Sequence, residues 1–224
     1  CGALFFCPLP VAPTMWSSVF IIDPLITLPL VLGCVVAAWL GARPGAKRAV
    51  VASLAFVGVY LGWSLLAKAI AGREAERSLA AIGLADAPRF TVPMPFNTLL
   101  WRVVAMTPDG FVEGERSIVA DRGPIRFTHH PSDTEALDAV RMQPQVARLL
   151  WFNHHFMKAQ VRDGQLVLTD LRMGAEPDYS FRFAVAEHDG EGWRPIPVRQ
   201  LEWPWEASPQ LGAMWARIRN APPG

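Results

Sequence analysis

The chain has 224 residues, of which 51% are hydrophobic and 18% are charged, against an average of about 25% charged residues in soluble proteins. Its 21 basic and 20 acidic residues leave a formal net charge of +1. This balance excludes a polybasic nucleic-acid binder, and the high hydrophobic content excludes intrinsic disorder. Three cysteines in a chain of this length exclude a disulfide scaffold. We therefore expect an ordered protein with no direct nucleic-acid binding.

Charges are distributed unevenly along the chain. Residues 73–224 carry 17 basic and 19 acidic residues, whereas residues 1–72 carry only Asp23, Arg43, Lys47, Arg48 and Lys68. Two runs of 19 residues in the first part, 24–42 and 49–67, contain no charge. As a helix, each run would be roughly 28 Å long, close to the ~30 Å of a hydrocarbon core. The pattern predicts a membrane region over 1–72 with two transmembrane helices; the alternative is a buried helical hairpin in a large soluble protein.

The linker between the two runs indicates the orientation. Residues 43–48 contain three basic residues and no acid. The positive-inside rule places such a loop in the cytoplasm. The large C-terminal part is then expected on the outer side of the membrane, with the lipid bilayer as the partner of residues 1–72.

Asp23 is the only acidic residue near these runs. A carboxylate inside a membrane is a functional candidate by default. However, Asp23 directly precedes Pro24, and aspartate followed by proline is also a normal way to begin a helix, with Asp at the N-cap and Pro at N1. The two roles are compatible, so both stay open for Asp23.

The remaining residues have a soluble composition. Residues 73–95 form an expected connector, in which 73–85 could continue a helix and three prolines follow: Pro88, Pro93 and Pro95. A soluble domain is expected over 96–224. Two β-hairpins are predicted, 98–119 and 156–171, because each has a turn with an Asp-Gly pair between strand-like segments.

Shorter signals complete the prediction for this domain. Further strands are expected over 125–129 and 179–186. Residues 132–135 read as a capping box before a helix, and 143–152 carry a helical apolar stripe. A short helix over 208–218 is expected near the end of the chain. The fold class is therefore α+β, with a mainly antiparallel sheet and one or two short helices.

No catalytic or metal-binding motif is present in the chain. The five histidines are His129, His130, His154, His155 and His188, and none shows the i, i+4 spacing of a helical zinc site. The nucleophile elbow, the dinucleotide-binding glycine motif and the P-loop are also absent. We expect the histidines at the surface, and we assign no metal ligand. Arg172, Glu176 and Arg182 are expected to form structural ion pairs within the sheet rather than to contact a substrate.

Three segments together resemble a known family: 16–30 (WSSVFIIDPLITLPL), 95–103 (PFNTLLWRV) and 171–183 (LRMGAEPDYSFRF). The family is the membrane-bound metal-dependent hydrolases of bacteria, also described as LexA-binding inner-membrane-associated hydrolases. The resemblance implies a multi-pass inner-membrane protein with a divalent metal, zinc in particular, and a LexA-like repressor as a partner. In that family the His and Asp ligands lie in N-terminal transmembrane helices, which would precede Cys1.

Within the matching segments, the resemblance offers Asp23, Asn97 and Arg102 as candidate catalytic residues. Asp23 could approach a metal site from the edge of the membrane, and Asn97 and Arg102 could hydrogen-bond a polar group there. The first hypothesis is the C-terminal portion of such a hydrolase, inactive without the upstream metal site and its helices. The alternative is a non-enzymatic membrane protein whose soluble domain binds a partner or a lipid. Because the chain begins with Cys1, we expect either a fragment or a truncated product.

Overall fold

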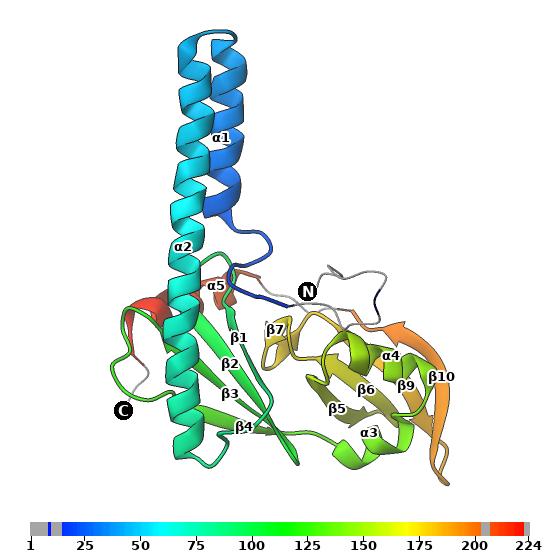
Figure 1. Cartoon of the computed structure of the whole chain (residues 1–224). Coiled ribbons are helices and arrows are strands. Elements are labelled where there is room, and N and C mark those ends of the chain that lie inside the picture. Colours follow the sequence, from blue (N-terminus) through cyan, green and yellow to red (C-terminus); the bar gives the residue numbers. More distant parts are fainter. Residues whose placement is uncertain (1–8, 10–14, 203–206, 222–224) are drawn as a thin grey trace.

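The computed structural model describes residues 9, 15–202 and 207–221. They form an α+β fold in which two N-terminal helices are followed by antiparallel sheets. Figure 1 shows the two helices as a hairpin that projects from one side of the sheets. This confirms the α+β fold class with antiparallel sheets. Cys1 lies outside the described residues, so the interpretation of the start of the chain stays a prediction.

The hairpin consists of α1 (Pro24–Leu40) and α2 (Pro44–Ala81). Proline occupies the first turn of both helices, where its missing N–H costs nothing, and Gly41 ends α1 with a φ of 60°. Within the described residues, only α2 is long and apolar enough to cross a membrane; α1 is apolar but shorter. The second predicted run, 49–67, lies inside α2, and the expected helical continuation beyond 73 is confirmed as far as Ala81.

The first sheet contains β1 (Arg89–Pro93), β2 (Leu100–Thr107), β3 (Gly110–Ser117) and β4 (Phe127–Pro131), in that spatial order. The predicted hairpin is confirmed, with Thr107 paired to Gly110. The structure corrects the expected connector 73–95, because β1 already belongs to the domain. Proline ends this strand at the sheet edge, where a missing ladder N–H is tolerated.

The lower half of α2 packs on this first sheet. Ala75 and Leu79 are fully buried against Val103 and Ala105 of β2. One continuous helix therefore carries both the apolar hairpin and a part of the domain core, which fixes the hairpin rigidly to the sheet.

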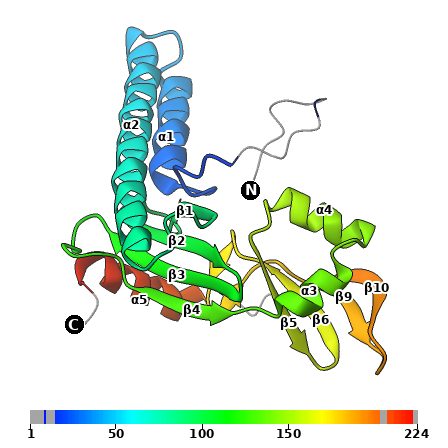
Figure 2. The same cartoon turned by 60° about the horizontal axis from the view of Figure 1, so that its bottom comes forward.

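The second sheet has the order β10-β9-β6-β5. Its strands are β5 (Met157–Arg162), β6 (Gln165–Asp170), β9 (Arg182–His188) and β10 (Trp193–Gln200). Helices α3 (Thr134–Val140) and α4 (Pro144–Phe152) cover one face of it, as Figure 2 shows from below. The second predicted hairpin is confirmed. Sequence analysis missed β10, because its two prolines and a shifted register hide the strand pattern.

Two local expectations are corrected. Tyr179 does not begin the strand predicted over 179–186; it belongs to β8 (Asp178–Tyr179), which pairs with β7 (Gly174–Ala175), and β9 begins at Arg182. The N-cap of α3 is Asp133, whose Oδ1 accepts from the Ala136 N–H at 3.1 Å, and not Ser132. Ser132 Oγ instead accepts from the Ala159 N–H of β5 at 2.9 Å.

The helix α5 (Ala207–Arg219) agrees with the helix predicted over 208–218. Its Met214 and Ile218 are buried against Leu100 of β2. Ser117 Oγ at the end of β3 donates to the Ile218 carbonyl at 2.7 Å. The last described helix therefore packs against the first sheet, close to the foot of the hairpin (Figure 1).

Candidate functional site

Arg102 lies on β2 with 1% of its surface exposed, at the junction of the two sheets. Its Nη1 donates to the Leu171 carbonyl at 2.6 Å. Its Nη2 donates to Glu113 Oε2 at 2.6 Å and to the Tyr179 hydroxyl at 2.8 Å. The Tyr179 hydroxyl in turn donates to Glu113 Oε2 at 3.0 Å. Arg102, Glu113 and Tyr179, which we call the buried triad, thus join β2, β3 and β8.

The charges of the buried triad stabilise one another. Burial alone would lower the pKa of Arg102, but the hydrogen bond and charge of Glu113 raise it above its ordinary value. Burial raises the pKa of the Tyr179 hydroxyl, and the positive charge of Arg102 offsets only a part of this rise. At neutral pH, Arg102 is therefore a cation and Tyr179 a neutral donor. Removing one member of the buried triad would leave the others buried without a partner for their charge or hydrogen bond.

Asn97 is also buried, with 3% of its surface exposed, in the loop between β1 and β2. Its Oδ1 accepts from the Leu99 and Leu100 N–H groups at 2.9 and 2.8 Å. Its Nδ2 donates to the Pro95 carbonyl at 3.0 Å. Because the amide satisfies its own loop in both directions, Asn97 shapes the entry into β2 rather than presenting a free polar group.

Asp23 occupies the N-cap of α1, as one of the two open roles requires. Its Oδ1 accepts from the Leu25 N–H at 2.9 Å, and its Oδ2 accepts from the Tyr60 hydroxyl of α2 at 2.7 Å. Only 2% of Asp23 is exposed. The carboxylate therefore begins α1 and ties it to α2, and both of its oxygens are engaged.

The three candidates do not form one site. Within the part of the chain that the structure describes, no hydrogen bond or ion pair joins Asp23, Asn97 and Arg102 to each other. Each of them serves a different junction: the helix pair, the β1–β2 loop and the contact between the sheets. Sequence reasoning missed their partners Tyr60 and Glu113. Tyr60 lies 37 positions from Asp23, and Glu113, although it belongs to the same predicted hairpin as Arg102, stands in no recognisable motif.

Two further ion pairs lie near the buried triad. Lys158 Nζ of β5 contacts Glu176 Oε1 at 2.6 Å, and Arg172 holds Asp170 with three hydrogen bonds from its side chain. Arg172 also donates to the Phe152 carbonyl at 3.0 Å. Arg182 donates to the Glu202 carbonyl. Arg172 and Glu176 therefore form ion pairs as expected, but both lie in turns and not within the sheet, while Arg182 bonds a backbone oxygen.

The two adjacent histidine pairs and His188 do not gather in one cluster. His129 Nε2 lies 3.2 Å from Asp109 Oδ1 on the surface, His130 stacks on Phe111, and His188 packs edge-on against Trp193. Across residues 15–202 and 207–221, no three His, Cys, Asp or Glu side chains are placed to hold a metal ion. The zinc that the resemblance implies therefore does not fit the described residues, and no chemical step through a metal follows from them.

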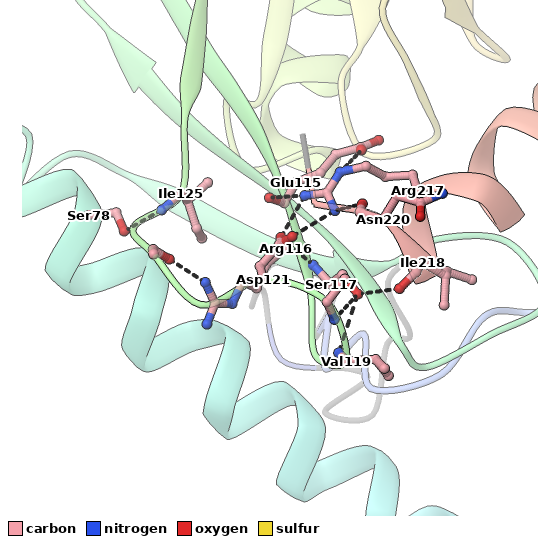
Figure 3. Close-up of polar contacts among 12 residues, drawn as sticks. Ser78, Glu115, Arg116, Ser117, Val119, Asp121, Ile125, Arg217, Ile218 and Asn220 are labelled. Carbon is pink, nitrogen blue, oxygen red and sulfur yellow. Dashed lines mark hydrogen bonds and ion pairs between the residues drawn. The ribbon is translucent and has the colours of Figure 1, made fainter. Parts of the chain in front are cut away.

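A charged cavity of about 590 Å³ opens beside the buried triad. Its lining mixes acidic and basic side chains: Glu113, Glu115, Asp121, Glu176, Arg122, Arg126 and, from α5, Arg217. Figure 3 shows Arg217 between the carboxylates of Glu115 and Asp121. Arg217 contacts Asp121 through two hydrogen bonds of 2.8 and 2.6 Å, and its Nε lies 3.5 Å from Glu115 Oε2.

The pKa values of the two carboxylates around Arg217 shift in opposite directions. Burial, with the nearby charge of Glu113, raises the pKa of Glu115 despite the opposing effect of Arg217. Burial would also raise the pKa of Asp121, but its hydrogen bonds from Arg217 and from the Ser117 N–H lower it. Arg217 therefore pairs mainly with Asp121. This cluster attaches α5 to the first sheet and is not an acid–base pair that faces a substrate.

Comparison with known proteins identifies no similar protein. The chain matches no family model, no curated protein and no solved structure. The fold and the contacts described above are therefore the basis of the functional argument.

Proposed function

We propose that the α1–α2 hairpin anchors this chain in the inner membrane of a bacterium, with both helices crossing the bilayer. The hairpin surface is apolar: it exposes Leu28, Leu32 and Val35 on α1, and Leu54 and Val59 on α2, each by more than half. Such a continuous exposed apolar surface is disfavoured in water and matches a hydrocarbon environment. The basic turn at 43–48 then favours a cytoplasmic tip and an extracytoplasmic C-terminal domain.

Protease treatment of intact spheroplasts tests this topology. Trypsin should remove the C-terminal domain from outside, because Arg141 and Arg162 lie exposed on its surface and neither is followed by proline. A cytoplasmic marker protein should stay intact in the same sample. Protection of the domain until the membrane is lysed would reverse the proposed orientation, and release of the whole chain by carbonate washing would overturn the anchoring itself.

For the activity, the proposal is that the chain forms the C-terminal portion of a membrane-bound metal-dependent hydrolase. The observation that carries it is the meeting of the three resembling segments. Phe20 of the first segment contacts Phe96 of the second, with ring centroids 5.3 Å apart. Arg102 of the second binds Leu171 and Tyr179 of the third. The resemblance therefore follows a connected structural unit at the foot of the hairpin, not three isolated patches.

In this proposal, the chain itself supplies a scaffold. Asp23, Asn97 and Arg102 position the hairpin, the β1 to β2 loop and the two sheets, and the metal ligands come from helices upstream in the full protein. The hairpin offers those helices an exposed apolar surface to pack against.

Metal analysis separates the two hypotheses for the activity. The 224-residue chain and the longest product of the same reading frame are purified in a nonionic detergent, and their zinc content is measured. We expect no stoichiometric metal in the short chain and about one divalent ion per chain in the long product, with esterase or phosphatase activity on generic substrates. Stoichiometric zinc in the short chain, or a reading frame that adds no His- and Asp-bearing helix, would overturn the proposal.

The second candidate is a non-enzymatic membrane protein whose soluble domain binds a partner or a lipid. The engagement of Asp23, Asn97 and Arg102 in internal hydrogen bonds favours it, because the only unpaired donor among them, Arg102 Nε, is buried. This candidate predicts stable insertion of the 224-residue chain by itself. Degradation of the expressed chain without insertion would remove its support.

A further inference from the structure

A second cavity, of about 500 Å³, lies where the hairpin meets the domain. It is formed by the segment before α1, by α2, by β1 and by the turn that follows α4, and its wall combines Trp16, Phe90 and Phe156 with the polar side chains of Lys68 and Arg89. Figure 1 shows the segment before α1 passing beside α2 at the level where the hairpin ends and the sheets begin. We call this cavity the interfacial pocket.

Lys68 supplies the unusual charge of the interfacial pocket. Its Nζ donates to the Ser17 carbonyl at 3.1 Å and to the Thr91 carbonyl at 3.0 Å. Two of its three N–H donors are thus used, both on neutral oxygens. In the residues that the structure places, no carboxylate forms an ion pair with Lys68. A partly buried ammonium without an anion favours an anionic ligand.

The other charges in the interfacial pocket do not cancel Lys68. Glu76 lies on the same face of α2, two turns further along, but its carboxylate contacts Arg89 Nη2 at 2.7 Å. That acid and Arg89 balance each other. One positive charge is left over, next to the exposed ring of Trp16, which has 69% of its surface accessible.

The position of Lys68 along α2 sets its depth in a membrane. Residues 49–67 carry no charge, and Arg48 and Lys68 bracket them. The distance from Arg48 to Lys68 along the helix is roughly 30 Å at 1.5 Å per residue, which equals the ~30 Å thickness of a hydrocarbon core. With Arg48 at one surface, Lys68 and the interfacial pocket lie at the other, at the depth of the lipid headgroups, where tryptophan is also enriched.

The backbone around the interfacial pocket is strained. Ser17, whose carbonyl accepts from Lys68, has a φ of 48°, and His154 and His155 have φ values of 56° and 65°. Positive φ is costly for such residues and gathers at ligand sites. His154 lies in the wall of the pocket. The fold therefore holds an unfavourable conformation on two sides of the same cavity.

We propose that the interfacial pocket binds the phosphate of an anionic phospholipid, with Lys68 as its cationic partner and Trp16, Phe90 and Phe156 against the glycerol and upper acyl chain. The inference rests on the proposed membrane anchoring and is independent of the hydrolase activity. A lipid fits better than a free phosphate because the pocket combines a cation with three aromatic rings and lies at the depth where the acyl chains join the headgroup.

The test counts the lipids that the delipidated full chain binds in nonionic detergent, by native mass spectrometry. Dioleoylphosphatidylglycerol and dioleoylphosphatidylcholine are the two probes. We expect one tightly held phosphatidylglycerol per chain and no comparable phosphatidylcholine. The variant Lys68→Met should weaken this binding by about tenfold or more, since it removes a charged hydrogen bond. Lys68→Arg should restore most of it, and Lys47→Met, at the exposed tip of the hairpin, is the matched control and should bind as the unchanged protein does.

A second variant keeps the charge and fills the space. A Cβ on Gly72, which lies in the wall of the pocket on α2, would meet no atom within 4 Å, and the same holds for Gly58 on the lipid-facing part of the helix. Gly72→Leu should therefore fold well, because leucine favours a helix over glycine, and should still lose phosphatidylglycerol. Gly58→Leu is the matched control and should retain it.

The outcomes are distinct. Equal binding of both lipids, or unchanged binding in Lys68→Met and Gly72→Leu, would overturn the lipid site. Displacement of phosphatidylglycerol by millimolar inorganic phosphate would identify a plain anion site and overturn the lipid as its occupant. Flotation with phosphatidylcholine vesicles tests the anchoring separately: a chain that floats but lacks selective lipid binding keeps the anchoring and loses the pocket.

Discussion

Asp23 shows how a single carboxylate can join two helices. One oxygen begins α1 through the Leu25 N–H, and the other accepts from the Tyr60 hydroxyl of α2. Both hydrogen bonds lie in a place that water hardly reaches, since 2% of Asp23 is exposed. At this depth an unpaired acceptor or hydroxyl costs more than the bond contributes when made.

We predict that Asp23→Ala destabilises the chain by about 1–3 kcal/mol, through the lost N-cap and the stranded Tyr60 hydroxyl. Asp23→Asn should cost clearly less, because an amide can still cap the helix and bond the hydroxyl. Thermal unfolding followed by circular dichroism in detergent measures both. Equal losses in the two variants would mean that the negative charge itself is required, which would favour a site role for Asp23.

Glu115 and Asp121 should respond to pH in opposite ways. The lowered pKa of Asp121 means that its carboxylate stabilises the fold above its ordinary pKa of 3.8, and that this is lost as the pH falls through the folded pKa. The raised pKa of Glu115 means that its contribution is present below 4.5 and is lost as the pH rises through the folded pKa.

The corresponding variants should therefore move in opposite directions at neutral pH. Asp121→Asn should lower the denaturation midpoint, and Glu115→Gln should raise it or leave it unchanged. The Glu115→Gln difference should shrink as the pH falls through the raised pKa of Glu115, and the Asp121→Asn difference should shrink only as the pH falls below 3.8 toward the lowered pKa of Asp121. Chemical denaturation at a series of pH values measures this. A destabilising Glu115→Gln at neutral pH would show that its contact with Arg217 outweighs its burial.

At the scale of elements, α1 and α2 approach closely at one point. Gly33 is the one buried residue of α1, and a Cβ there would lie 2.8 Å from Ser53 Cβ of α2 and overlap the Ser53 hydroxyl. A small residue is therefore required for this approach. Small residues at helix contacts are the usual means by which membrane helices pack.

Gly33→Val should push the helices apart and destabilise the hairpin by about 1–3 kcal/mol, as overpacked contacts do. The double variant with Ser53→Gly should recover a part of the loss, because it frees the overlapped space. A disulfide-trapping or unfolding assay in detergent reports the contact. Gly58→Val, where a Cβ meets open space, is the control; if it were equally harmful, helix propensity and not packing would explain the loss.

At the scale of the whole molecule, the buried triad joins the two sheets. Arg102 comes from the first sheet. Its partner Leu171 directly follows β6 of the second sheet, and Tyr179 lies on β8 in the connection between β6 and β9. The same region contains the apolar contacts of Phe90, Phe111 and Phe156. The sheets therefore share a polar and an apolar contact, which should make them unfold as one unit.

Arg102→Met should destabilise the domain by about 3–5 kcal/mol, because it leaves Glu113 without its cation. Tyr179→Phe should cost only about 1 kcal/mol, since Arg102 and Glu113 stay paired. Arg194→Met removes an exposed ion pair with Glu187 and should change stability by less than about 1 kcal/mol. Chemical denaturation measures all three, and hydrogen exchange should show the loss in Arg102→Met first around 171–181. A mild effect of Arg102→Met would mean that apolar packing alone holds the sheets together.

Local patterns in the sequence determined much of this protein. The uncharged runs, the Asp-Gly turns and the apolar stripes indicated the helices of the hairpin, both β-hairpins and α5, because each depends on residues close together in the chain. The prolines of β1 and β10 misled the same reasoning, since an edge strand tolerates residues that a central strand does not.

Tertiary structure alone decided the roles of the candidate residues. From the sequence, Asp23 could be an N-cap, a functional carboxylate or both. The structure adds that its second oxygen accepts a hydrogen bond from Tyr60, 37 positions away. Arg102 was a candidate for substrate contact until Glu113 and Tyr179 accounted for its charge. Nothing in the sequence indicated a role for Lys68. Its role depends on the fold, which among the described residues pairs Lys68 with two carbonyl oxygens and with no carboxylate. Partners distant in sequence are set by packing, and no local pattern encodes them.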